Sequence, residues 1–117
     1  MEVILAEKAG FCFGVQRAIN TAFKAAGEGR VYCLGPIIHN PQEVARLKDA
    51  GVETIEDFSR LQPGDSLIIR SHGVPPTVLT KAREQGLTII DLTCPFVAKA
   101  QQHAEMLKKE GYQIVVV

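Results

Sequence analysis

The sequence lacks several features that would assign it to a class at once. No apolar run approaches the roughly 20 residues that a membrane-spanning helix needs. The 13 basic residues balance the 13 acidic ones, so the formal net charge is zero and gives no overall attraction to nucleic acid or to an acidic membrane. The three cysteines are an odd number at wide spacing, which argues against a secreted disulfide framework. We therefore expect a cytoplasmic protein without a nucleic-acid or membrane partner.

Common catalytic motifs are missing as well. There is no C-x-x-C or H-x-x-x-H pair for a closed zinc site, no G-x-x-x-x-G-K loop for phosphates and no nucleophile elbow. What remains is a chain of 117 residues, 46% hydrophobic and 22% charged, which fits one ordinary globular domain. Its first residues carry no basic region and are expected to form a strand rather than a signal peptide.

Strand and helix patterns alternate along the chain. Short apolar runs predict strands at residues 3–6, 31–34, 52–55, 66–70, 87–90 and 112–117. Helices are expected at residues 13–27, 41–50, 76–85 and 95–110, with one or two helical turns at 56–61. Strands that are apolar throughout are typical of a sheet covered on both faces. The sequence therefore predicts an α/β fold with a mostly parallel sheet flanked by helices.

Two of these helices carry further signals. Asn40 can cap the helix at residues 41–50, and Glu43 can close a capping box with it. In the helix at residues 95–110, an apolar stripe is expected to face the core, and its members are Val97, Ala100, Gln101, Ala104 and Leu107.

Four residues whose side chains can react or bind a ligand stand at equivalent places in this pattern. Each follows a predicted strand and lies at or near the start of a helix, and the set is Cys12, His39, His72 and Cys94. The ends of parallel strands meet at one edge of the sheet, where ligands bind. Helix amino termini and histidines at this edge suit an anion such as phosphate. Two cysteines there suit a soft metal or an iron–sulfur cluster.

The cysteines and histidines also allow plainer interpretations. Cys12 lies between Gly10 and Gly14 where a strand meets a helix, which favours a metal-bound or reactive thiol but leaves a buried structural thiol open. Cys33 lies inside a short apolar strand and is expected to pack in the core. His103 stands mid-helix among polar residues and is expected to be solvated.

Four segments resemble the LytB family, the 4-hydroxy-3-methylbut-2-enyl diphosphate reductases of the non-mevalonate isoprenoid pathway. They contain the four residues above in the order and spacing of the family. The segments are Ala9-Gly10-Phe11-Cys12-Phe13-Gly14-Val15 with Arg17-Ala18, Gly35-Pro36-Ile37-Ile38-His39-Asn40, Arg70-Ser71-His72-Gly73-Val74 and Asp91-Leu92-Thr93-Cys94-Pro95.

The resemblance implies a redox function. Family members hold a 4Fe-4S cluster through three cysteines, and Cys12 and Cys94 match the first two. Two further kinds of match follow: His39 and His72 correspond to histidines that hold the substrate's diphosphate, while Val15 and Val97 correspond to apolar residues beside the substrate. The implied reaction is a reductive dehydroxylation that yields isopentenyl and dimethylallyl diphosphate. Its electrons come from a ferredoxin- or flavodoxin-like donor.

The resemblance also implies that this chain is only part of such an enzyme. Family members are longer and form a three-lobed assembly of similar α/β domains. Residues 1–94 are expected to form the first lobe and residues 95–117 the opening helix and strand of a second. The third cluster cysteine, a third diphosphate-binding histidine and a proton-relay glutamate lie beyond Val117 in the family, and Cys33 does not replace that cysteine. We expect little activity from this chain alone.

Two other interpretations stay open. A stand-alone α/β module could bind a small phosphorylated ligand at the same edge without redox chemistry. A homo-oligomer could rebuild a shared cluster from several copies. In either case residues 112–117, a strand cut off from a sheet of its own, are expected to be poorly ordered or paired with another molecule.

Overall fold

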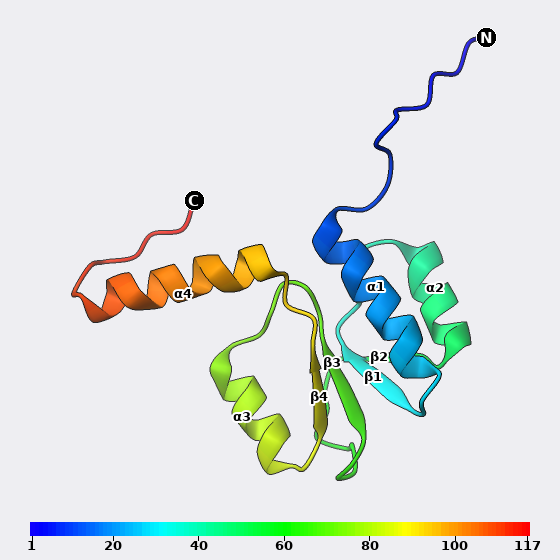
Figure 1. Ribbon diagram of the computed structural model, residues 1–117. Helices are drawn as coiled ribbons and strands as arrows, with labels where there is room; N and C mark the ends of the chain where they lie inside the picture. The colour runs from blue at the N-terminus through cyan, green and yellow to red at the C-terminus, as the bar shows by residue number, and fades with distance from the viewer.

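A parallel four-stranded sheet with helices on both faces forms the body of the protein (Figure 1). The computed structural model describes the whole chain, residues 1–117. The elements in order are α1 (Phe13–Ala26), β1 (Val31–Leu34), α2 (Pro41–Ala50), β2 (Val52–Ile55), β3 (Ser66–Ile69), α3 (Pro76–Glu84), β4 (Thr88–Asp91) and α4 (Pro95–Lys109). The strand order is β2-β1-β3-β4, and every neighbouring pair is parallel. The predicted α/β class is confirmed.

The core lies in two layers because apolar residues of β3 alternate between the faces of the sheet. Ile68 belongs to the layer under α1 and α2, whereas Leu67 and Ile69 belong to the layer under α3. All three side chains are fully buried, as expected for a central strand covered on both faces. Figure 1 shows α1 and α2 together on one side of the sheet and α3 on the other.

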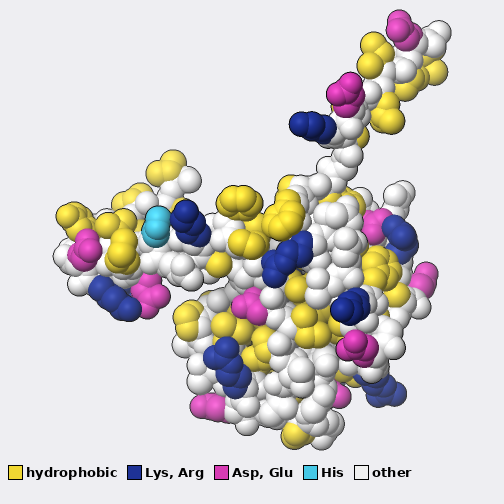
Figure 2. Space-filling model, viewed as in Figure 1, with side chains coloured by type: hydrophobic (Ala, Val, Ile, Leu, Met, Phe, Trp, Pro, Cys, Tyr) yellow, Lys and Arg dark blue, Asp and Glu magenta, His cyan; other side chains and the backbone are white.

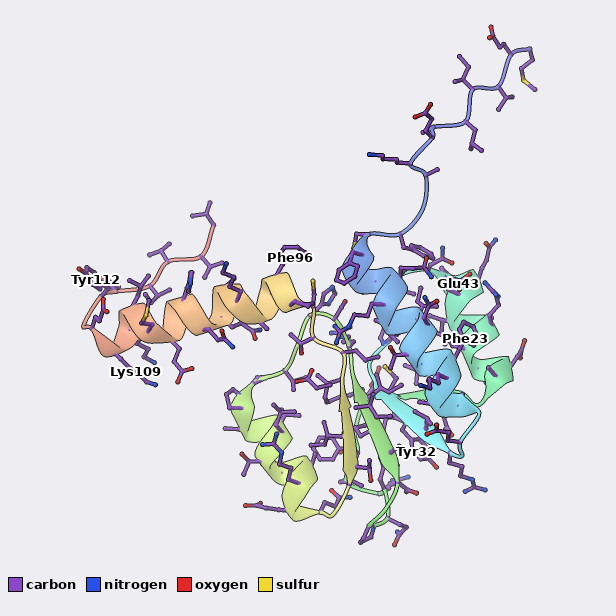
Figure 3. The ribbon with its side chains drawn as sticks, in the orientation of Figure 1. Phe23, Tyr32, Glu43, Phe96, Lys109 and Tyr112 are labelled. Atoms are coloured by element: carbon purple, nitrogen blue, oxygen red, sulfur yellow. The ribbon has the colours of Figure 1, made fainter.

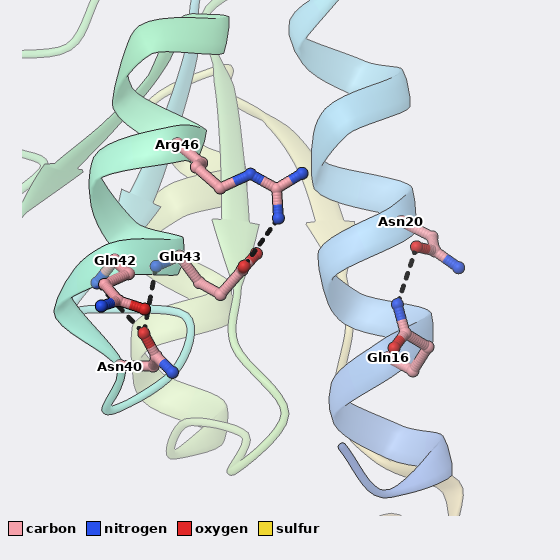
Figure 4. Close-up of polar contacts among 6 residues, drawn as sticks. All are labelled: Gln16, Asn20, Asn40, Gln42, Glu43 and Arg46. Carbon is pink, nitrogen blue, oxygen red and sulfur yellow. Dashed lines mark hydrogen bonds and ion pairs between the residues drawn. The ribbon is translucent and has the colours of Figure 1, made fainter. Parts of the chain in front are cut away.

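The start of α2 shows how local sequence fixes the helix boundaries. The Asn40 side chain accepts hydrogen bonds from the amides of Gln42 and Glu43 at 3.0 and 3.1 Å, as a capping residue does (Figure 4). The expected capping box is not completed, because the Glu43 carboxylate instead accepts a 2.7 Å bond from Arg46. Gly51 ends the helix with a φ of 109°, a conformation that glycine adopts readily.

Both chain ends differ from the prediction. Residues 1–12 contain no strand, and the side chains of Val3, Ile4 and Leu5 are 79–85% exposed. Residues 112–117 likewise contain no strand. They pair with no strand of the sheet, as expected for a segment without a sheet of its own in this chain. A β-strand needs a partner for its backbone hydrogen bonds, and the four strands of the sheet pair only with one another. An apolar β-type pattern alone does not supply that partner.

The predicted helical turns at residues 56–61 are also wrong. This segment forms bends and turns before β3. The side-chain amide of Gln85 donates to the carbonyls of Phe58 and Leu61 at 2.9 and 2.7 Å. The Phe58 carbonyl also accepts a bond from the Leu61 amide at 3.0 Å, which closes a single turn. The Gln85 side chain supplements that turn and satisfies the Leu61 carbonyl without a helix.

Helix α4 leaves the sheet and has no buried residue. In the predicted inner stripe, Val97 and Ala104 are half-buried, while Ala100, Gln101 and Leu107 are exposed. Figure 1 shows α4 extending away from the other helices, so nothing in this chain covers that stripe along most of its length. No helix of the chain combines the length and the apolar character needed to cross a membrane.

Candidate site at the carboxyl edge of the sheet

The amino termini of the helices gather at one edge of the sheet. Helices α2, α3 and α4 each begin a few residues after the carboxyl end of β1, β3 or β4. Helix α1 is held to the same edge by Arg17, whose Nη1 donates to the carbonyl of Thr93 at 3.4 Å. Free backbone amides at helix amino termini create a local positive potential, which suits an anion.

Cys12 and Cys94 occupy matching positions as the residues that precede α1 and α4. Neither side chain makes a capping hydrogen bond to its helix, and neither forms a disulfide, so both thiols are free to bind a ligand. Cys12 is exposed and Cys94 is half-buried. The backbone amide of Cys94 donates to the carbonyl of Ser71 at 2.9 Å, which fixes the loop that carries the thiol.

Gly14 allows Cys94 to approach the first turn of α1 closely. A Cβ atom at Gly14 would lie 2.7 Å from Cys94 Sγ and 3.1 Å from Cys94 Cβ. Cys94 therefore packs directly on the first turn of α1, within two residues of Cys12. This contact cannot be predicted from the sequence, because it depends on how α1 lies against the loop after β4.

His39 and His72 also meet at this edge. Their rings are stacked with centroids 6.0 Å apart and an interplanar angle of 27°. His39 is in the loop after β1 and His72 is in the loop after β3, and both side chains are exposed. Because β1 and β3 are neighbours in the sheet, their following loops lie side by side. The convergence of these two histidines is as predicted.

Val15 and Val97 stand three residues after Cys12 and Cys94, in the first turns of α1 and α4. Both side chains are half-buried. Phe96 lies between the second thiol and Val97, is 73% exposed and points outward at the start of α4 (Figure 3). Apolar residues thus stand in the first turn of each helix that follows a cysteine.

Comparison with known proteins identifies the family. Residues 3–117 match the model of the family described as LytB protein. The chain belongs to the LytB family. It is 56% identical over 118 residues to a 4-hydroxy-3-methylbut-2-enyl diphosphate reductase of Geobacter sp. (strain M21) and 54% identical to the one of Citrifermentans bemidjiense. Each alignment covers 100% of this chain and 42% of the relative, so the chain spans about two fifths of the length of these relatives.

Solved structures of LytB-family reductases have the same fold. A structure described as (E)-4-hydroxy-3-methyl-but-2-enyl diphosphate reductase, the terminal enzyme of the non-mevalonate pathway, is 50% identical with a TM-score of 0.81. The match covers 94% of this chain and 40% of that one. The E-1-hydroxy-2-methyl-but-2-enyl-4-diphosphate reductase from Plasmodium falciparum is 34% identical with a TM-score of 0.85, over 91% of this chain and 34% of its own.

The donor set of this LytB chain fits part of an iron–sulfur site. Thiolates are the usual ligands of such clusters, and Cys12 and Cys94 are free thiols at one edge of the sheet. No group of three or more His, Cys, Asp or Glu residues is arranged to hold a metal ion. The chain thus offers two free thiols of the type that a cluster binds.

Cys33 and His103 do not belong to the site, as expected. Cys33 is 1% exposed within β1, and burial raises the pKa of its thiol to about 11, although the nearby Arg70 guanidinium partly opposes this. A thiol of this kind stays protonated and is a poor metal ligand. His103 is exposed on α4.

Proposed function

We propose that this chain is the amino-terminal part of a 4-hydroxy-3-methylbut-2-enyl diphosphate reductase. The whole enzyme would replace the allylic hydroxyl of its substrate by hydrogen, with two electrons and two protons, and release water together with isopentenyl or dimethylallyl diphosphate. The observation that carries the proposal is the placement of two free thiols and a stacked histidine pair at one edge of the sheet in a LytB-family chain.

His39 and His72 are proposed to bind the diphosphate. Each imidazole can present one N–H donor to phosphate oxygens, and both rings are exposed at the carboxyl edge. Helices α2 and α3 begin within a few residues of them, so the backbone amides of their first turns add positive potential. The stacked geometry holds the two donors close enough to serve one ligand.

Cys12 and Cys94 are proposed to ligate a 4Fe-4S cluster together with a third cysteine from outside this chain. When bound, that cluster supplies electrons and a Lewis-acidic iron for departure of the hydroxyl. Val15 and Val97 would border the carbon skeleton of the substrate and exclude water from it. A ferredoxin- or flavodoxin-like donor is the proposed source of electrons, and the three unpaired cysteines favour a cytoplasmic location.

We further propose that residues 1–94 contribute a first lobe and residues 95–117 the opening helix of a second. Every buried residue lies between Gly14 and Leu92, whereas α4 has none. Large apolar side chains are exposed only in residues 1–13 and 96–117. Figure 2 shows such side chains along α4 and the amino-terminal tail. An uncovered apolar surface of this kind is typical of a segment that packs against further protein.

Anaerobic reconstitution with iron, sulfide and a small thiol tests the assignment of the thiols. The small thiol stands in for the ligand that this chain lacks. We expect the chain to bind iron and sulfide, Cys12→Ser and Cys94→Ser to abolish binding, and Cys33→Ala to retain it because Cys33 is buried. Light scattering should show a monomer with the cluster bound. Binding that survives both Cys12→Ser and Cys94→Ser would contradict the proposal, and a cluster found only in oligomers would favour sharing between copies.

A phosphate-binding module without redox chemistry is the second candidate. It is favoured by the fact that the histidine pair and the helix amino termini require neither thiol. A chain that carries both Cys12→Ser and Cys94→Ser separates the two candidates. Binding of inorganic diphosphate by that variant, combined with failure of the unsubstituted chain to bind iron and sulfide, would favour the module.

A further inference from the structure

The peptide that joins Thr93 to Cys94 is held from both sides. Its amide, on Cys94, donates to the carbonyl of Ser71 at 2.9 Å, and its carbonyl, on Thr93, accepts from Arg17 Nη1 at 3.4 Å. The chain has no cis peptide bond, and the C=O and N–H groups of a trans peptide point in opposite directions. Ser71, in the loop after β3, and Arg17, on α1, therefore hold this peptide from opposite sides.

Arg17 supplies the hydrogen bond that joins α1 to the loop after β4. The other side-chain hydrogen bonds of α1 stay within the helix. On the side of the loop, the amide and the hydroxyl of Thr93 both donate to the Asp91 carboxylate. The carbonyl is thus the one polar group of Thr93 that another element can hold, and Arg17 binds it.

Gly14 and Arg17 contact this loop from the same face of α1. They are three residues apart, so their positions are neighbours on the surface of the helix. A Cβ atom at Gly14 would lie 2.7 Å from Cys94 Sγ, which shows how closely the thiol approaches the helix there. Gly14 leaves room for Cys94, and Arg17 binds the carbonyl of the residue before it. The two contacts together hold consecutive residues of the loop against α1.

Neither an ion pair within the chain nor the helix dipole accounts for the place of Arg17. This half-buried residue takes part in neither of the two ion pairs, which are Arg46–Glu43 and Lys109–Glu105. It also lies in the second turn of α1, toward the positive end of the helix dipole, where a cation is not stabilised. The specific interaction of its guanidinium in this chain is the bond to the Thr93 carbonyl.

We propose that Arg17 is a positioning residue for the thiol of Cys94. By holding the Thr93–Cys94 peptide against α1, it sets where Sγ lies on the first turn of the helix that Cys12 precedes. This inference rests on the proposed function of the two thiols as ligands of one cluster. Groups that orient metal ligands are an integral part of such sites, because they fix the direction of the donor atom.

Two rates measured on the chain without a cluster test the assignment. In a Cys12→Ser background, they are the reaction of Cys94 with neutral iodoacetamide and the hydrogen exchange of the Cys94 amide, followed by NMR. Arg17→Met keeps an apolar stem but removes every donor, and it should raise both rates about threefold, as expected for the loss of one long and therefore weak hydrogen bond. Arg17→Lys carries donors on a slightly shorter stem, so both of its rates should lie between those of Arg17→Met and Arg17.

Two control variants lie on the same helix. Lys24→Met removes an exposed cation that makes no bond to the loop, and it should leave both rates unchanged. Ala22→Gly weakens α1 at a buried position while the bond to Thr93 remains. It should lower the free energy of unfolding without a change in either rate, because these rates report local opening of the loop. Circular dichroism establishes that each variant is folded, and Arg17→Gln, whose amide is too short to reach Thr93, provides a second removal of the bond.

A further measurement connects the assignment to the thiol's proposed role. After anaerobic reconstitution, Arg17→Met should bind less iron and sulfide per chain than the original, and Arg17→Lys should recover part of the loss. Lys24→Met should bind as much as the original chain. Full binding of iron and sulfide by Arg17→Met would show that the cluster does not need this positioning.

Three results from the rates would overturn the assignment. A change in thiol reactivity without a change in amide exchange would mean that Arg17 acts on the thiol by its charge rather than on the peptide. Equal increases in Ala22→Gly would mean that general loosening of α1 is sufficient, and equal rates in Arg17→Lys and Arg17→Met would mean that the donated bond is not the cause. Because the rates need no cluster, failure of the original chain to bind iron would contradict the proposed function alone.

Discussion

Gly14→Ala tests whether the close approach of α1 to Cys94 organises the site. The new Cβ would lie 2.7 Å from Cys94 Sγ and 3.1 Å from Cys94 Cβ. Comfortable contacts between such atoms are about 3.5–4.0 Å, so the sulfur would have to move by roughly 1 Å and the loop that carries it by about 0.5 Å. Overpacking of this size costs about 1–3 kcal/mol.

A gain in helix propensity opposes this cost. Gly14 is in the first turn of α1, where alanine is favoured over glycine by up to about 1 kcal/mol. The net expectation is a loss of about 1 kcal/mol in the free energy of unfolding, measured by urea denaturation. The matched control is Gly27→Ala at the end of the same helix. Gly27 has a φ of −68°, and its added Cβ would contact only Lys24 O, at 3.4 Å. We expect this variant to be as stable as the original chain or slightly more stable.

The position of the thiol gives a second measurement. In a Cys12→Ser background, Cys94 is the only cysteine that is not buried, so a thiol-specific reagent reports on it. Gly14→Ala should raise the rate of that reaction, because Sγ must leave the surface of α1 that partly covers it. Gly27→Ala should not change the rate. The reasoning is refuted if Gly14→Ala matches Gly27→Ala both in unfolding free energy and in the reactivity of Cys94.

Three further predictions concern the lobe that carries the site. Burial raises the pKa of Cys33 from 9.0 to about 11, so folding favours the protonated thiol. The contribution of this thiol to the free energy of unfolding should be full below about pH 9 and fall by up to about 3 kcal/mol as the pH rises toward 11. Cys33→Ala should flatten this pH dependence in urea titrations. Asn40→Ala removes two bonds to the first turn of α2 and should cost about 1 kcal/mol by thermal denaturation, whereas Asn20→Ala on the exposed face of α1 should cost close to nothing. Gln85→Ala removes bonds to three carbonyls of the loop before β3 and should make that loop cleavable at lower protease concentration. Equal cleavage of Gln62→Ala, whose side-chain amide makes only one 3.5 Å bond, would contradict this explanation.

The helices and strands that were predicted best are determined by residues close to them in the sequence. Asn40 caps the start of α2, because its side chain accepts hydrogen bonds from the amides of the first turn. Gly51 ends the helix, because it adopts a left-handed backbone conformation. Strands β1 and β3 follow from short runs of apolar residues. The prediction failed where distant residues decide the structure. The loop at residues 56–61 is held by Gln85, which lies 24–27 residues further along the chain from the carbonyls it binds.

The same distinction applies to the candidate site. The rule that parallel strands end at one edge was sufficient to predict that His39 and His72 would meet. It did not predict the contact of Gly14 with Cys94 or of Gly35 with Arg70, because each depends on the packing or register of two separate elements. Pattern reasoning therefore predicted which candidate residues meet at this edge, whereas the close contacts at the small residues Gly14 and Gly35 became visible only in the structure.

The spacing between the proposed anion site and the thiols is set by backbone rather than by side chains. Ser71, which is buried, accepts a hydrogen bond from the amide of Cys94 at 2.9 Å and immediately precedes His72. One residue past β4, the amide of Leu92 donates to the carbonyl of Ile69 at 2.8 Å. This bond continues the ladder between β3 and β4. The loops after β3 and β4 thus remain paired beyond the ends of the strands. A ligand held at His72 and a group held at Cys94 would therefore keep a fixed separation. Changes in helix α4 would reach this pair of loops through Cys94 and through Gln101, whose side-chain nitrogen would lie 3.1 Å from a Cβ atom at Gly73.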